Sequence, residues 1–150
     1  MVYLGIDPGF TGAWGLINHH GDYIGCGDMI HNDKWIDNNS VYREICLARD
    51  QDDMMIVIEA VHSMPKQGVS SSFKFGMAYG SAISLAQRLL VDWELVTPKV
   101  WKRDLGLTSD KTDSLNMARQ KWPEAPLKRI KDNGRAEALL LAEWLRQAYC

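Results

Sequence analysis

The sequence predicts an α/β fold in which a mixed β-sheet is flanked by α-helices. Three short apolar segments joined by turns open the chain, which is typical of an antiparallel meander. Farther on, apolar segments of strand length alternate with segments of helical period, which indicates parallel strands connected by helices. With 150 residues, 46% of them hydrophobic, we expect residues 1–150 to form a single domain.

The strands are expected in two groups. Residues 2–7, 12–18 and 22–29 are short, apolar and separated by turn-forming residues, so they predict the three strands of the meander. Residues 54–59 contain five consecutive apolar side chains without alternation, which indicates a strand covered on both faces. Residues 93–96 predict one further short strand.

The helices are expected where apolar side chains recur at helical spacing or where a capping signal precedes such a run. Pro123 ends one of these runs. The predicted helical segments are residues 41–50, 73–90, 98–101, 112–122 and 133–149.

Composition excludes several classes of protein. No apolar run reaches eighteen residues and no basic, apolar leader precedes the first strand, so we expect a cytoplasmic protein without a membrane segment. Cys26, Cys46 and Cys150 have no paired spacing, which argues against a disulfide framework or a zinc site. The net charge is -2, but residues 97–135 hold ten Lys or Arg against five Asp or Glu. This modest asymmetry is compatible with a nucleic-acid-binding face and equally with an ordinary solvated charged surface.

Two carboxylates stand at the ends of apolar strands. Asp7 closes the first strand, on the same side as Tyr3 and Gly5, and Glu59 closes the most apolar strand of the chain. A buried carboxylate without a partner costs several kcal/mol in desolvation. Taken singly, Asp7 before Pro-Gly is also ordinary turn chemistry, and Glu59 is equally consistent with a salt bridge at a strand end.

A third acid lies in the apolar stripe of the last helix. At about 100° per residue, Glu137 shares its face with Leu140, Leu141 and Trp144. A carboxylate in the middle of a core-facing stripe is unusual for a structural helix. If the helix crosses the strand ends, the three acids converge and need Mg²⁺ or Mn²⁺ to neutralise them. Two such ions about 4 Å apart are typical of phosphodiester hydrolysis.

These residues resemble those of a known family. Gly-Ile-Asp-Pro-Gly at 5–9, the strand that ends in Glu59, Ser-Phe-Lys-Phe-Gly at 72–76 and Ala-Glu-Ala-Leu at 136–139 occur in the order found in RuvC-type Holliday junction resolvases, especially small bacteriophage-like ones, within the RNase H-like superfamily. The resemblance spans nearly the whole chain. The first motif alone also begins other RNase H-like proteins, including sugar-kinase-type ATPases.

The resemblance implies a set of site residues. Asp7, Glu59 and Glu137 would hold two Mg²⁺ or Mn²⁺ ions, with Glu137 at the position of the last acid of the family. The family commonly has another acid three residues earlier, but Gly134 stands there in this chain. Asp132 is included as the fourth catalytic and metal-binding acid, provided that the helix begins after it, and Asn133 is the alternative.

The resemblance also implies contacts with DNA. The candidates for phosphate contact are Lys66, Lys74, Lys102 and Lys111. His62 and Met64, in the loop after the Glu59 strand, are candidates for a wedge that opens base stacking at the junction centre. Among the tryptophans we select Trp101, between Lys99 and Lys102, as the candidate for DNA contact.

The function that follows is an endonuclease that resolves four-way DNA junctions by metal-dependent hydrolysis. By resemblance it would act as a homodimer, since symmetric cutting needs two sites, in the cytoplasm of a bacterium or of a phage-infected host. A related nuclease acting on RNA or on general branched DNA, and an inactive junction-binding protein, remain alternatives. A nucleotide cofactor is not expected, because no later Gly-rich loop could hold its phosphates.

Overall fold

The computed structural model describes residues 1–62 and 65–150, and within them five strands form one mixed sheet. The strands are β1 (Val2–Asp7), β2 (Ala13–Asn18), β3 (Tyr23–Asp28), β4 (Met54–Glu59) and β5 (Trp93–Val96). They are arranged in the order β3-β2-β1-β4-β5. The first three form an antiparallel meander, whereas β4 runs parallel to β1, and β5 parallel to β4. The predicted mixed sheet is therefore confirmed.

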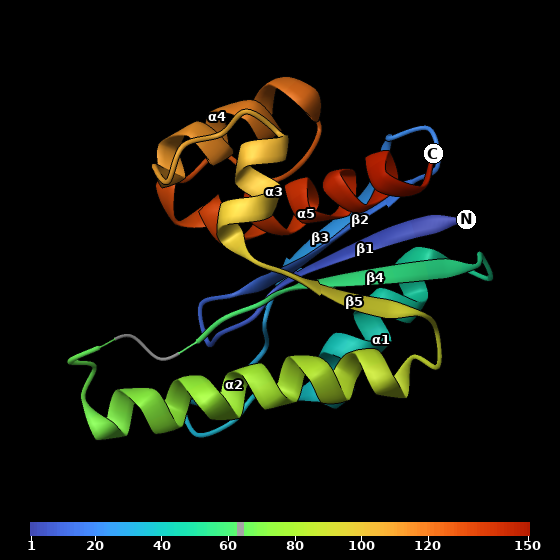
Figure 1. Cartoon of the computed structure of the whole chain (residues 1–150). Coiled ribbons are helices and arrows are strands. Elements are labelled where there is room, and N and C mark those ends of the chain that lie inside the picture. The colour runs from blue at the N-terminus through green and yellow to red at the C-terminus, as the bar shows by residue number, and fades with distance from the viewer. Residues whose placement is uncertain (63–64) are drawn as a thin grey trace.

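Helices cover both faces of this sheet (Figure 1). On one side lie α1 (Asn38–Arg49) and α2 (Val69–Arg88). On the other lie α3 (Pro98–Asp104), α4 (Lys111–Lys121) and α5 (Asn133–Tyr149), and the short 3-10 turn η1 (Ile130–Asp132) leads into α5. Three helices, α1, α2 and α3, are longer than predicted. The α2 helix already begins at Val69, because Gly68 is the extended N-cap residue and the serines after it lie in the helix.

The sheet separates two apolar cores. On the side of α1 and α2, Leu4, Ile6 and Ile58 are fully buried. On the side of α5, Tyr3 and Val57 pack against the leucines of that helix. Alternate residues of β1 and β4 thus point to opposite faces, and the odd-numbered ones face α5. Asp7 and Glu59 continue this alternation on the α5 side.

A glycine lets α5 approach the sheet closely. A Cβ atom at Gly5 would lie 2.0 Å from the carbonyl oxygen of Ala138 and 2.7 Å from the amide nitrogen of Ala142, so any side chain there would collide with the helix backbone. Glu137 immediately precedes Ala138. The close packing at Gly5 therefore places the Glu137 turn of α5 above the ends of β1 and β4.

Within the described residues, no helix is both long and apolar enough to span a lipid bilayer.

Candidate active site

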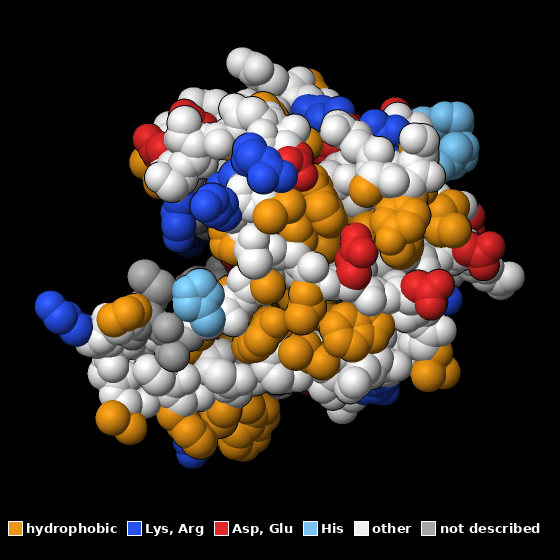
Figure 2. Space-filling view, in the orientation of Figure 1, with side chains coloured by type: hydrophobic (Ala, Val, Ile, Leu, Met, Phe, Trp, Pro, Cys, Tyr) orange, Lys and Arg blue, Asp and Glu red, His pale blue; other side chains and the backbone are white. Residues whose placement is uncertain are grey.

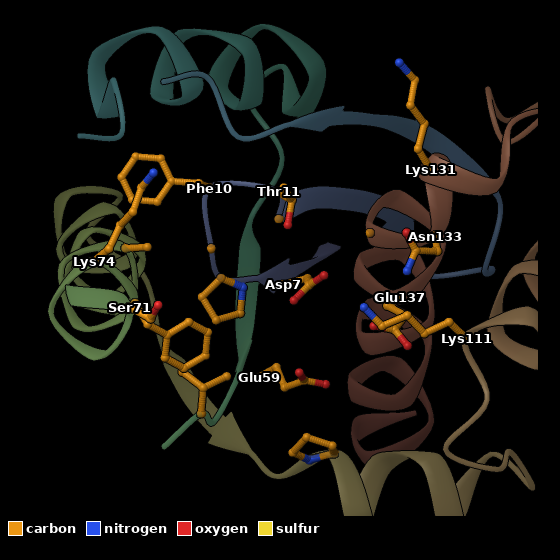
Figure 3. A pocket seen from close by; sticks show the side chains of 18 of the residues that line it. Asp7, Phe10, Thr11, Glu59, Ser71, Lys74, Lys111, Lys131, Asn133 and Glu137 are labelled. Atoms are coloured by element: carbon orange, nitrogen blue, oxygen red, sulfur yellow. The ribbon is translucent and has the colours of Figure 1, made fainter. Parts of the chain in front are cut away.

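Two of the predicted acids come from neighbouring parallel strands. Ile6 of β1 is paired with Ile58 of β4, so Asp7 and Glu59 follow at the same level of the sheet. Neighbouring strands lie about 4.8 Å apart, and side chains at matched positions point to the same face. Figure 3 shows both carboxylates directed toward α5. The register of the two strands therefore brings these acids side by side.

The third acid, Glu137, reaches the same place from α5. It is buried, and its Oε1 atom accepts a hydrogen bond from Lys102 Nζ at 2.7 Å and a longer one from Ser114 Oγ at 3.3 Å. Lys102 belongs to α3 and Ser114 to α4. Two further elements thus fix the orientation of Glu137, and neither contact was foreseen from the sequence.

The three acids line one cavity of about 690 Å³ at the end of the sheet. Lys74 from α2 lines the cavity across from Asp7 and Glu137, and Lys111 from α4 lies next to Glu137 (Figure 3). Lys102 from α3 also lines the cavity. Lys and Arg side chains also gather over α3 and α4 on the side that faces the start of α2 (Figure 2). A cavity lined by both carboxylates and lysines can hold divalent cations at the carboxylates and a DNA phosphodiester at the lysines.

Burial and like charges act strongly on Asp7. Its pKa is raised well above the usual value, first by burial and then by the negative charges of Glu59 and Glu137, while the lysines of the cavity oppose this shift. None of the described residues donates a hydrogen bond to this carboxylate. In the metal-free chain, Asp7 is therefore a carboxylate without an adequate partner.

Glu59 is held differently. Trp101 Nε1 donates a hydrogen bond to its Oε2 atom at 2.7 Å, and Trp101 is fully buried. Burial raises the pKa of Glu59, the Trp101 hydrogen bond lowers it, and the charge of Glu137 raises it further, so the net direction is upward. The selection of Trp101 for DNA contact was wrong, because the indole is enclosed in the core and orients Glu59 instead.

The donor atoms present suit a hard divalent cation. All three acids are carboxylates, and one oxygen each of Glu59 and Glu137 has no partner among the described residues. However, no group of three or more His, Cys, Asp or Glu side chains in residues 1–62 and 65–150 is already placed to hold a metal ion. The ligands are of the right kind and share one cavity, but their side chains have to draw together around an ion.

The fourth expected acid lies elsewhere. As predicted, α5 begins after Asp132, but the Asp132 carboxylate accepts hydrogen bonds from Arg129, with Nη2 at 2.7 Å from Oδ1 and the backbone nitrogen at 2.8 Å from Oδ2. These bonds lower the pKa of Asp132. The structure therefore does not bring Asp132 to the other acids. The next residue, Asn133, lines the cavity instead (Figure 3).

Gly134 marks the place of the missing acid. A Cβ atom there would lie 3.6 Å from Oδ2 of Asp7 and 3.0 Å from the carbonyl oxygen of Thr11. A carboxylate at this position would therefore stand beside Asp7. Glycine at this position therefore leaves the cavity without a carboxylate next to Asp7 from the start of α5.

Some of the candidates for DNA contact line the cavity and others do not. Lys74, Lys102 and Lys111 line the cavity, whereas Lys66 and His62 are exposed and do not. Met64 lies outside the described residues. Lys74 is also placed over the Phe10 ring, 4.5 Å from its centroid.

The fold has known relatives in solved structures. No family model and no curated protein matches the sequence. Among solved structures, RuvC of Thermus thermophilus in complex with a Holliday junction substrate matches with a TM-score of 0.71 at 19% identity, covering 99% of this chain and 94% of that one. A second Thermus thermophilus RuvC structure matches with a TM-score of 0.58, also at 19% identity, covering 99% of this chain and 95% of that one. The fold of this chain is therefore the fold of RuvC.

Proposed function

We propose that this protein is a metal-dependent endonuclease that resolves four-way DNA junctions. The observation that carries the proposal is the convergence of Asp7, Glu59 and Glu137 in one cavity walled by lysines. The match in fold to a RuvC that was solved with a Holliday junction substrate adds to it.

Asp7, Glu59 and Glu137 are the residues that would hold Mg²⁺ or Mn²⁺. When bound, two such ions activate a water for in-line attack on the phosphodiester and stabilise the leaving 3'-oxygen. Trp101 keeps Glu59 in place through its indole N–H, and Ser114 keeps Glu137 in place through its hydroxyl. Asn133 lines the cavity and precedes Gly134, the position at which RuvC-type resolvases commonly have an additional acid. The Asn133 amide can orient the water or the phosphate.

The lysines provide the positive charge that a phosphodiester needs. Lys111 and Lys74 are exposed at the wall of the cavity and have no carboxylate partner among the described residues. Lys102 is different, because its ammonium neutralises Glu137 in the metal-free chain. If Glu137 served as a metal ligand, Lys102 would be free to contact the scissile phosphate.

The proposal includes a homodimer. The outer side of α2 carries Val69, Phe73 and Met77, which are 89%, 70% and 36% exposed and recur every four residues on one side of the helix. Hydrophobic side chains are visible along that outer side (Figure 2). A second copy is the occupant that we propose for this stripe, because two sites are needed to cut opposed strands of a junction.

The decisive experiment compares four labelled substrates with one preparation of the protein: a four-way junction, a flap, a duplex and an RNA hairpin. We expect Mg²⁺- or Mn²⁺-dependent cleavage of the junction, and a loss of at least about a hundredfold in the Asp7→Asn and Glu137→Gln variants.

Each other outcome has a definite meaning. Tight binding of the junction without nicking would replace the proposal with a junction-binding protein. Faster cleavage of RNA or of flaps than of junctions would identify a nuclease of different specificity. Full activity in both variants would remove the three acids from catalysis.

A further inference from the structure

A second hollow adjoins the cavity of the three acids. It has a volume of about 440 Å³ and lies between the turn after β1 and the segment that leads into α5. Phe10, Thr11, Gly12 and Lys131 line both this hollow and the acidic cavity. The two spaces therefore meet at these four residues, and a chain-like ligand bound at the acids has the second hollow next to it on this side.

The walls of this second hollow carry two cationic side chains. Arg129 and Lys131 form one wall, and His31 and Phe10 form the other. Figure 3 shows Lys131 extending away from the three carboxylates, from the start of α5. Lys131 is exposed and has no ion-pair partner among the described residues.

Two acids at this hollow are already paired with arginines. Asp28 accepts two hydrogen bonds from Arg135, at 2.7 and 2.8 Å, and Asp132 is held by Arg129. The Arg129 side chain is still 52% exposed after making that pair. An anion entering the hollow therefore meets Lys131 and the outer side of Arg129, and Asp33 beside His31, 93% exposed, is the nearby acid without a Lys or Arg partner among the described residues.

The residue between these two cations is apolar and exposed. Ile130 is 88% exposed at the tip of the turn before α5. Its packing in the fold does not explain its presence there. An apolar side chain between two cations is well suited to lie against a sugar while its neighbours contact phosphates.

We infer that this hollow is a binding site for the DNA backbone, in which Lys131 and Arg129 contact phosphates of the strand next to the scissile phosphate. The inference rests on the proposed function, because it needs a DNA strand in the acidic cavity. It adds a contact that fixes how far the strand extends beyond the cut and in which direction it leaves the site.

The test is a thermodynamic cycle between protein and DNA, measured with Ca²⁺ in place of Mg²⁺. Single phosphates flanking the cut are replaced in turn by neutral methylphosphonates, and junction binding is measured for the native protein and for Lys131→Ala. We expect Lys131→Ala to weaken binding about three- to tenfold and to reduce the slope of log K against log salt by about 1. We also expect one or two methylphosphonates to weaken binding of the native protein but not of Lys131→Ala.

The matched control is Lys128→Ala, which removes the same charge from the same segment at a position that lines neither hollow. Equal losses in the two lysine variants, or additive effects at every phosphate, would overturn the inference. Either result can be obtained only if the native protein binds the junction and cuts it, because the methylphosphonates are placed around the cut. A native protein that does neither would instead overturn the proposed function, so the two failures are distinguishable.

Discussion

The effect of Asp7 on stability depends on its surroundings. Burial and the charges of Glu59 and Glu137 raise its pKa in the folded chain. A group of this kind favours folding most below its unfolded pKa of about 4, and its contribution is lost as the pH rises toward the folded pKa. At neutral pH and without metal, Asp7 therefore opposes folding, because the unfolded chain gives up this proton more readily than the folded chain.

The Asp7→Asn substitution should consequently stabilise the metal-free protein although it removes activity. We expect a gain of about 1–2 kcal/mol at pH 7 in the presence of EDTA, shrinking as the pH approaches 4. Urea unfolding at several pH values measures this, with the exposed Asp92→Asn as the control. A loss of stability in Asp7→Asn at pH 7 would contradict the electrostatic account of the cavity.

Gly134 provides a second test at the level of one residue. Because a Cβ atom there would lie near Asp7, Gly134→Asp places a fourth carboxylate in the cavity, while Gly134→Asn has nearly the same size without the charge. Relative to Gly134→Asn, we expect Gly134→Asp to melt lower in EDTA and to gain more stability from Mn²⁺. Thermal unfolding with and without Mn²⁺ gives both quantities, and equal metal-induced shifts would show that residue 134 is outside the metal site.

At the scale of elements, the site depends on how closely α5 lies against β1. Gly5→Ala would push its new methyl group into the backbone of α5 at Ala138. We expect a loss of about 3 kcal/mol or more in the free energy of unfolding, since neither the strand nor the helix backbone can yield easily. The control is Gly76→Ala in α2, where a Cβ atom meets nothing within 4 Å and should stabilise the helix by up to about 1 kcal/mol. Denaturant unfolding of both variants compares them directly, and similar effects would refute the packing argument.

The elements were largely predictable because their patterns are local. Alternation along β1 placed Asp7 on the side of Tyr3 and Gly5, and the helical stripe placed Glu137 on the buried face of α5. The partners of these acids were not predictable. Lys102 is 35 residues away from Glu137 in the sequence, and Trp101 is 42 residues away from Glu59. Contacts between distant elements leave no periodic signal in a single sequence.

Asp132 shows the same limit over a shorter range. The sequence correctly indicated a helix starting after it, but the direction of its side chain depends on Arg129, three residues earlier. From its position in the turn before α5, the Asp132 carboxylate had two possible roles. It could point into the cavity as a metal ligand, or it could form an ion pair with Arg129. The nearby guanidinium supplies bidentate hydrogen bonds without crossing the cavity, so the arginine takes the carboxylate.

At the scale of the whole molecule, the exposed stripe of α2 predicts self-association. Phe73→Glu puts a charge at the centre of that stripe, which a second copy would have to bury without a partner. We expect native protein to sediment as a dimer and Phe73→Glu as a monomer in analytical ultracentrifugation. Leu90→Glu is the control, because Leu90 is also exposed but follows α2 and lies away from the stripe. A native monomer at all concentrations would contradict the dimer.

The proposed hydrolysis requires above all that divalent ions draw the carboxylates of β1, β4 and α5 together. Mn²⁺ binding, followed by electron paramagnetic resonance of the free ion, tests this directly in the native protein and in Asp7→Asn and Glu137→Gln. We predict saturable binding by the native protein and at least about a tenfold loss of affinity in each variant. Native-like affinity in both variants, or no saturable binding by the native protein, would contradict the account.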